Sequence, residues 1–184
     1  MKRWHATQTD GRPRLSQNGR CVPEYTRPAT WEDVKRLARY FEEARVEYAL
    51  IGGYALAAHG LARFTEDVDV LVNPAPANSQ RWIVALSRLP DGAAQELAPN
   101  PDVFAAQQRY AIRINDEITV DVLPSAAGHS WDELRRHIVE FEIDDMRIKI
   151  LDLPGLLKTK EVPRPKDQAD AEAIRHAIEL LQRK

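Results

Sequence analysis

The stretch YALIGGYALAAHGLARFTEDVDVLV, residues 48–72, joins two hydrophobic runs through a Gly-Gly pair and a short helical segment. The second run carries Asp67 and Asp69, separated by Val68. Alternate side chains of a strand share a face, so we expect both carboxylates to project to the same side. Neighbouring carboxylates repel each other and strands disfavour Asp, whereas a bound Mg²⁺ ion would offset the repulsion. The alternative is a solvent-facing acidic edge, which the flanking hydrophobic residues disfavour.

The Gly52-Gly53 pair predicts a contact with phosphate. It follows one predicted strand and precedes a helix. Glycine has no side chain, so the backbone N–H groups at such a turn can approach a phosphate closely. A Gly-Gly pair alone is commonly only a tight turn, and its spacing from Asp67 is what favours binding here.

A third carboxylate, Asp121, lies in the β-rich segment EITVDVL, residues 117–123. If this segment pairs with the strand that carries Asp67 and Asp69, three carboxylates converge. Three carboxylates are sufficient to hold two Mg²⁺ ions for in-line attack at a phosphorus atom.

In this order, the hydrophobic-Gly-Gly segment, the D-h-D strand and the later h-D-h strand resemble the nucleotidyltransferase superfamily, which has the DNA polymerase beta-like fold. The pattern G-G-Y-A-x(3)-H-G-x(2)-R-x-T-x-D-h-D-h is most similar to the small abortive-infection-type, or minimal, nucleotidyltransferases of toxin–antitoxin systems. The segment LLKTKEVPRPKDQADAEAI, residues 156–174, is similar to the R-x-K-D-x-x-D helix of those proteins. The resemblance covers roughly residues 31–181.

The resemblance implies an enzyme that moves a nucleoside monophosphate from an NTP to an acceptor hydroxyl and releases pyrophosphate. Two Mg²⁺ ions would be held by Asp67, Asp69 and Asp121, and Asp121 could accept the proton of the attacking hydroxyl. The acceptor stays open between a small molecule, an RNA and a protein. A cognate antitoxin or toxin partner is also implied.

Further candidates for binding the nucleotide are basic or hydroxylic residues. Arg63 and Thr65 lie just before the carboxylate strand, where Arg can neutralise phosphate and Thr can donate a hydrogen bond to it or cap the strand. Lys158 resembles the lysine that family members direct at the triphosphate, and Lys166 could also reach phosphate. The alternatives are an ordinary surface arginine and, for residues 158–166, a solvated basic loop.

Acidic residues of the same C-terminal segment have a different expected role. Asp167 and Asp170 are predicted to form structural ion pairs with nearby basic side chains.

Composition limits the other classes. The chain has 184 residues, with 26 basic and 28 acidic residues and a net charge of −2, which gives no general argument for binding nucleic acid or membranes. No run of about 18 apolar residues predicts a membrane span. The basic N-terminus lacks the apolar region of a signal peptide, and the single Cys21 suits a reducing compartment. We therefore expect a cytoplasmic protein.

Residues 1–29 are polar and are predicted to form an extended or disordered arm, whereas residues 30–184 form the nucleotidyltransferase domain, including C-terminal helices. The order of predicted elements favours an α+β fold, an α/β sandwich with a mixed sheet flanked by helices. The expected strands are 48–51, 67–72, 104–114, 117–123, 139–143 and 146–151, with hairpin turns at 115–116 and 144–145. The expected helices are 30–44, 53–59, 79–89, 130–137, one capped by Asp152, and a last one ending near 182.

Two other functional classes compete with the enzyme. One is a non-catalytic nucleotidyltransferase-fold module that acts as a regulator or toxin–antitoxin partner, although its site would be expected to have lost a carboxylate. The other is a metal-dependent phosphatase, but no nucleophile elbow or P-loop in the sequence supports it.

Overall fold

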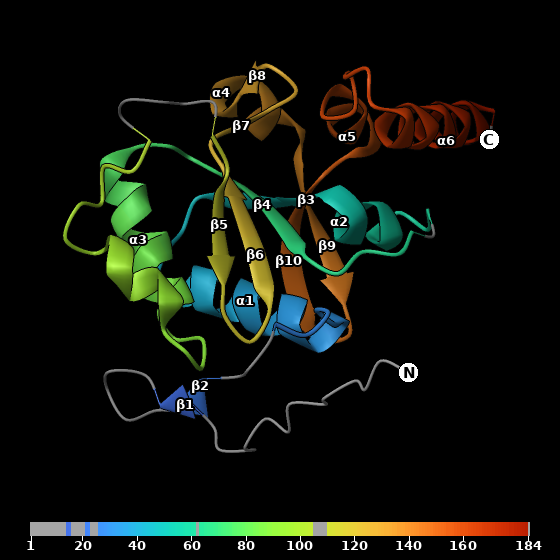
Figure 1. Cartoon of the computed structure of the whole chain (residues 1–184). Coiled ribbons are helices and arrows are strands. Elements are labelled where there is room, and N and C mark those ends of the chain that lie inside the picture. Colours follow the sequence, from blue (N-terminus) through green and yellow to red (C-terminus); the bar gives the residue numbers. More distant parts are fainter. Residues whose placement is uncertain (1–13, 16–20, 23–25, 62, 105–109, 184) are drawn as a thin grey trace, which may run out of the picture.

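The computed structural model describes residues 14–15, 21–22, 26–61, 63–104 and 110–183 (Figure 1). Most of the predicted arm, and part of the strand predicted at 104–114, lie outside these residues. Within the arm, the structure describes two short antiparallel strands that the sequence did not predict, β1 (Arg14–Leu15) and β2 (Cys21–Val22).

A six-stranded mixed sheet, in the order β5-β6-β4-β3-β10-β9, forms the centre of the fold (Figure 1). Its strands are β3 (Tyr48–Ile51), β4 (Val68–Val72), β5 (Ile112–Asn115), β6 (Thr119–Leu123), β9 (Ile138–Ile143) and β10 (Met146–Leu151). β4 runs parallel to β6 and β3 runs parallel to β10, whereas the other neighbours are antiparallel. A separate small hairpin joins β7 (Ser125–Ala126) to β8 (His129–Ser130). The predicted α+β class with a mixed sheet is confirmed.

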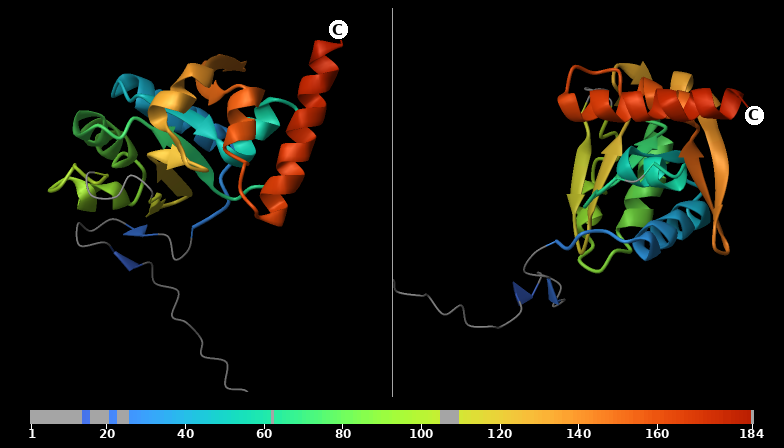
Figure 2. Two further views of the ribbon diagram at one scale, coloured as in Figure 1. Left: turned by 90° about the horizontal axis from the view of Figure 1, so that it is seen from above. Right: turned by 90° about the vertical axis from the view of Figure 1, so that its right-hand side faces the viewer.

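The described residues form these α-helices around the sheet: α1 (Trp31–Glu43), α2 (Gly52–Ala58), α3 (Pro76–Leu86), α4 (Trp131–Leu134), α5 (Leu153–Lys158) and α6 (Pro165–Gln182). α1 packs against α3, and α5 packs against α6. α1 and α6 lie on opposite sides of the molecule, as Figure 1 and the right-hand view of Figure 2 show. Among the described residues, no helix combines the length and the apolar character that crossing a bilayer would need.

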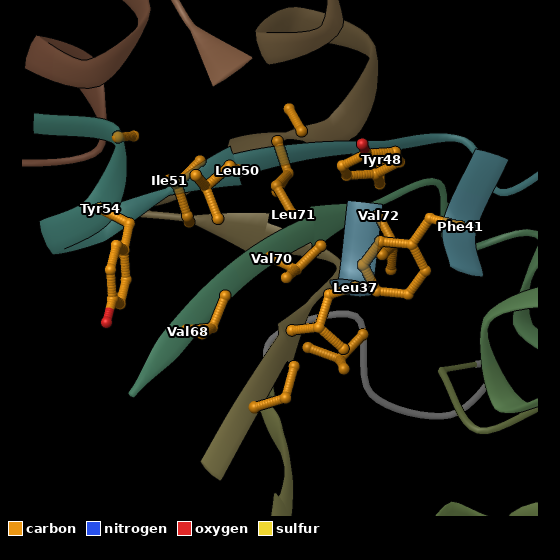
Figure 3. Packing of buried hydrophobic residues seen from close by; sticks show 14 of the residues in the cluster. Leu37, Phe41, Tyr48, Leu50, Ile51, Tyr54, Val68, Val70, Leu71 and Val72 are labelled. Atoms are coloured by element: carbon orange, nitrogen blue, oxygen red, sulfur yellow. The ribbon is translucent and has the colours of Figure 1, made fainter. Parts of the chain in front are cut away.

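Alternation along the central strands separates an apolar face of the sheet from the face that carries the carboxylates. Leu37 and Phe41 of α1 point toward Val68 and Val70 of β4 (Figure 3), and all four side chains are at most 2% exposed. Successive side chains of a strand point to opposite faces, so Asp69 lies on the side of the sheet away from α1.

Helix caps predicted from the sequence form as expected. Thr30 and Asp33 make a capping box at the start of α1, and Ser130 and Glu133 make one at α4. The carboxylate of Asp152 accepts a hydrogen bond from the backbone N–H of Gly155 at 2.7 Å and caps α5. These contacts satisfy backbone N–H groups that have no partner within the helix.

Two helix boundaries differ from the predictions. The helix expected at 79–89 is Pro76–Leu86, because proline fits the first turn of a helix, where its missing N–H is not needed. The helix expected at 130–137 ends at Leu134 and continues as a 3₁₀ turn, Arg135–His137.

The β5–β6 hairpin also differs from the prediction, in both strand length and turn. β5 is only Ile112–Asn115, and the turn spans 116–118 rather than 115–116. The carboxylate of Asp116 accepts hydrogen bonds from the backbone N–H groups of Asp91, Ala93 and Glu117 at 2.8 to 3.0 Å. The contacts with Asp91 and Ala93 are long-range, and nothing local in the sequence predicts them.

Residues 26–29, which the sequence placed in the arm, are held against the domain. The backbone N–H of Arg27 donates to the carbonyl of Glu117 at 3.0 Å, and that of Ala29 donates to the carbonyl of Glu66 at 2.9 Å. Ala29 is buried, and its carbonyl accepts a hydrogen bond from the hydroxyl of Tyr54.

An ion-pair network underlies this attachment. Asp33 is 3% exposed and receives the guanidinium of Arg27 at 2.6 and 2.8 Å, while Arg36 bridges Asp33 and Glu117 at 2.7 Å each. Burial raises the pKa of Asp33, but hydrogen bonds from Arg27 and Thr30 outweigh it and lower the pKa to about 2. Residues 26–29 are held in place because the buried carboxylate of Asp33 pairs with the guanidinium of Arg27.

Candidate active site

One row of paired residues crosses the sheet and contains two of the predicted carboxylates. The register pairs Arg113 with Asp121, Asp121 with Asp69, and Asp69 with Ile51. Because β4 and β6 are parallel and adjacent, Asp69 and Asp121 lie side by side on the face away from α1. The condition stated from the sequence, that the two carboxylate strands must be neighbours, is met.

Asp67 lies immediately before β4 and is oriented by Thr65. The hydroxyl of Thr65 donates to the Asp67 carboxylate at 3.1 Å and to its backbone carbonyl at 3.2 Å. Thr65 therefore positions a carboxylate in this structure, and its contact with phosphate stays a prediction.

Arg113 is the site residue that sequence reasoning missed. Its Nε and Nη2 donate to the two oxygens of Asp121 at 2.8 and 2.6 Å, and Nη2 also reaches Asp67 at 3.3 Å. A two-residue turn at 115–116 would have paired Arg113 with Ile118. The turn at 116–118 pairs Arg113 with Asp121 instead. A correct prediction of this turn would therefore have identified Arg113 as a neighbour of Asp121.

Asp69 is the carboxyl group of the site whose ionisation is opposed by its surroundings. Burial, followed by the neighbouring charges of Asp67 and Asp121, raises the pKa of Asp69 to about 7, and Lys160 and Arg63 offset part of that increase. The hydrogen bonds to Asp121 also raise the pKa of Arg113, which keeps its guanidinium charged.

The glycine pair allows the turn after β3 to approach the carboxylate strand. Gly52 has a φ of +67°, and a Cβ atom placed there would lie 1.9 Å from Oδ2 of Asp69. A Cβ atom on Gly53 would lie 2.6 Å from the Cβ of Thr65. Any side chain at Gly52 would thus displace the Asp69 carboxylate.

A cleft of about 1040 Å³ opens beside Asp69, which is the one of the three carboxylates among its lining residues. Its floor includes Gly52 and Asp69, and one wall comes from residues 123–128 and from α4. The opposite wall comes from residues after α5, including Lys160 and Arg164. The volume is large enough for a nucleotide-sized ligand.

Two basic residues of the C-terminal segment line the cleft, while the contacts of Lys158 and Lys166 with phosphate stay predictions. Lys160 and Arg164 line the cleft, whereas Lys158 and Lys166, the residues predicted from the sequence, do not. α5 ends at Lys158, so the following turn, rather than the helix, carries the chain over the cleft. Lys166 lies exposed on the first turn of α6.

Ion pairs fasten α6 to the site. Lys160 contacts Asp167 and Asp170, each at 3.0 Å, and Arg63 also pairs with Asp170. The predicted structural role of Asp167 and Asp170 is confirmed. Arg63 is not among the residues that line the cleft, and its contact with phosphate stays a prediction.

The chemistry of the donor set fits a divalent cation. Three carboxylates lie together, and Gly52 leaves the space beside Asp69 free of a side chain. Within the described ranges, however, no three His, Cys, Asp or Glu side chains already form a metal-binding group. Arg113 instead contacts two of the three carboxylates, Asp67 and Asp121.

A family model described as "Nucleotidyl transferase AbiEii toxin, Type IV TA system" matches residues 35–161, well over half of the chain. The chain belongs to the AbiEii family. The match includes the glycine pair, the row of carboxylates and Lys160. This AbiEii chain is therefore a nucleotidyltransferase, and the resemblance to abortive-infection-type enzymes is confirmed.

Comparison with solved structures agrees on the fold of the AbiEii chain. A crystal structure from Thermotoga maritima, described as a "putative nucleotidyltransferase", aligns with a TM-score of 0.52 and 11% identity. The alignment covers 84% of this chain and 93% of that chain. At this identity the likeness shows the fold alone. The search of curated proteins gave no match.

Replacing Gly52 by alanine is expected to destabilise the AbiEii chain more than the same change at Gly60. Both glycines have positive φ, so each alanine carries a backbone cost of about 1–2 kcal/mol. Only at Gly52 does the new methyl group meet Asp69, which adds a cost of about 1–3 kcal/mol. Urea unfolding of the two variants measures the difference, and equal losses would contradict the close approach.

Without divalent cations, the free energy of unfolding should depend on pH through Asp69. Folding raises the pKa of Asp69 to about 7, so the folded state favours the protonated side chain. The free energy of unfolding should therefore fall as pH rises from about 4 through about 7. Asp69→Asn keeps the group neutral and should exceed the wild type at pH 8 by up to about 4 kcal/mol. The two proteins should converge near pH 4. Urea titrations in EDTA measure this, and parallel pH profiles would refute it.

Proposed function

We propose that this AbiEii chain transfers a nucleoside monophosphate from an NTP to an acceptor hydroxyl in a Mg²⁺-dependent reaction that releases pyrophosphate. The observation that carries the proposal is the in-register pair of Asp69 and Asp121, in which Asp69 lines the cleft and Asp121 shares Arg113 with Asp67. Two Mg²⁺ ions held by these carboxylates would neutralise the triphosphate and activate the acceptor hydroxyl.

The chain's own residues would bind and orient the nucleotide. Lys160 and Arg164 supply positive charge on the wall opposite β7 and β8, where a triphosphate can receive it. Gly52 carries no side chain and lines the cleft next to Asp69, so its backbone is where we place the contact with phosphate. Asp121 is the residue that we assign to accept the proton of the attacking hydroxyl. Most of the catalytic effect would then come from positioning and charge stabilisation.

The acceptor is a small molecule, an RNA or a protein, and the wall formed by β7, β8 and α4 is where we place it. The family description names a toxin of a Type IV toxin–antitoxin system. It supports the further proposal that this chain acts as a toxin whose activity is countered by a cognate antitoxin.

Asp69→Asn and Asp121→Asn are expected to abolish nucleotide transfer while the chain stays folded. Each variant removes one charged metal ligand from the row, so at least a hundredfold loss is expected from removing charge stabilisation. The measurement is pyrophosphate release from ATP, GTP, CTP and UTP, with calorimetric titration of each NTP and Mg²⁺.

The matched control is Asp144→Asn, because Asp144 is an exposed aspartate that pairs with Lys35 and is not among the residues that line the cleft. It should retain nearly full activity. Wild-type activity in folded Asp69→Asn would refute the site.

Lys160→Ala is expected to weaken NTP binding by about tenfold or more, because it removes a cation that faces the cleft. Lys158→Ala removes the same charge two residues earlier and should leave the affinity nearly unchanged. Calorimetric titration in the presence of Mg²⁺ compares the two variants. A larger loss in Lys158→Ala would restore the sequence-based choice and overturn the structural one.

A further inference from the structure

Arg113 holds two of the three carboxylates through one guanidinium group. It makes a two-pronged contact with Asp121 and a longer contact with Asp67. Asp121 is the more enclosed partner, since its side chain is 13% exposed against 33% for Asp67. A buried carboxylate requires a partner of opposite charge, and in this structure the partner is an arginine.

The arginine is placed so that it can leave. Its side chain is 57% exposed, and it stands on β5, the edge strand of the sheet. An exposed arginine on an edge strand can change rotamer without disturbing the core. Ala111, two residues earlier, lines the cleft, so the released guanidinium would stay near its mouth.

The guanidinium and a divalent cation would require the same oxygen atoms. Both oxygens of Asp121 and one oxygen of Asp67 are engaged by Arg113, and these two residues supply two of the three carboxylates proposed as metal ligands. Beyond this competition for lone pairs, the arginine charge repels an incoming cation at close range.

We propose that Arg113 is a built-in competitor of the divalent cation: it neutralises Asp121 and Asp67 in the nucleotide-free chain, and it must release them before metal can bind. The inference rests on the proposed metal-dependent function. A triphosphate would offer the released guanidinium new acceptor oxygens, because arginine matches phosphate as well as carboxylate. Metal binding would then be weak without nucleotide and strengthened by it.

The test is Mn²⁺ binding to the full chain without nucleotide, followed by the electron paramagnetic resonance signal of free Mn²⁺. Arg113→Gln removes the charge and the two-pronged contact, so it should bind Mn²⁺ at least about tenfold more tightly than the wild type. Arg135→Gln is the matched control, because Arg135 also lines the cleft but pairs with Asp132 at 2.9 Å. Its affinity for Mn²⁺ should equal that of the wild type.

Equal or weaker binding by Arg113→Gln would overturn the inference, as would an equal gain in Arg135→Gln, which would indicate a general charge effect. If Arg113→Gln does not fold, Arg113→Lys replaces it. Lysine keeps the charge but not the two-pronged contact, so binding at least about threefold tighter is expected. Wild-type affinity in Arg113→Lys would then overturn the inference.

Asp69→Asn separates this inference from the proposed function. Mn²⁺ binding that is lost in Asp69→Asn, yet equal in the wild type and Arg113→Gln, would leave the metal site standing and remove only the competitor role. Absence of Mn²⁺ binding in both the wild type and Arg113→Gln would overturn the metal site and the competitor together.

Discussion

The parallel pairing of β4 with β6 is the constraint on which the site depends, because it sets the carboxylates of Asp69 and Asp121 side by side. Burial, followed by repulsion from Asp67 and then from Asp121, raises the pKa of Asp69. Basic side chains offset this repulsion. Arg113 donates hydrogen bonds to Asp121, and the charges of Lys160 and Arg63 act on Asp69. The three carboxylates thus form a negatively charged site. A bound metal ion would replace, or add to, the positive charge that the arginine and lysine side chains supply.

The β5–β6 hairpin, which carries Asp121, is held by arginine–carboxylate contacts at both ends. Near the site, Arg113 bridges to Asp121, and at the turn Glu117 receives Arg27 and Arg36. The turn contacts also attach the segment that precedes α1, so the N-terminal boundary of the domain and the position of Asp121 are fixed by one hairpin.

α6 reaches the site through a second set of charges. Asp170 takes both Arg63, from the loop before β4, and Lys160, from the turn after α5. The C-terminal helix thereby links two segments that lie far apart in the sequence, and it holds Lys160 on the wall of the cleft. The AbiEii family match ends at residue 161, so it includes Arg63 and Lys160 but not α6.

Helices and strands that depend on neighbouring residues could be predicted from the sequence. Alternation and apolar runs identified β3, β4 and β6, side-chain caps identified the starts of α1, α4 and α5, and the spacing of the glycines and carboxylates identified the family. Tertiary structure decided the rest, because each remaining feature depends on contacts between distant residues. Asp116 fixes the turn that brings Arg113 opposite Asp121, and Glu117 and Glu66 hold residues 27 and 29. Lys160 lines the cleft and Lys158 does not, because α5 ends at Lys158 and the turn that follows it reaches the cleft. The position of that turn depends on how α5 packs.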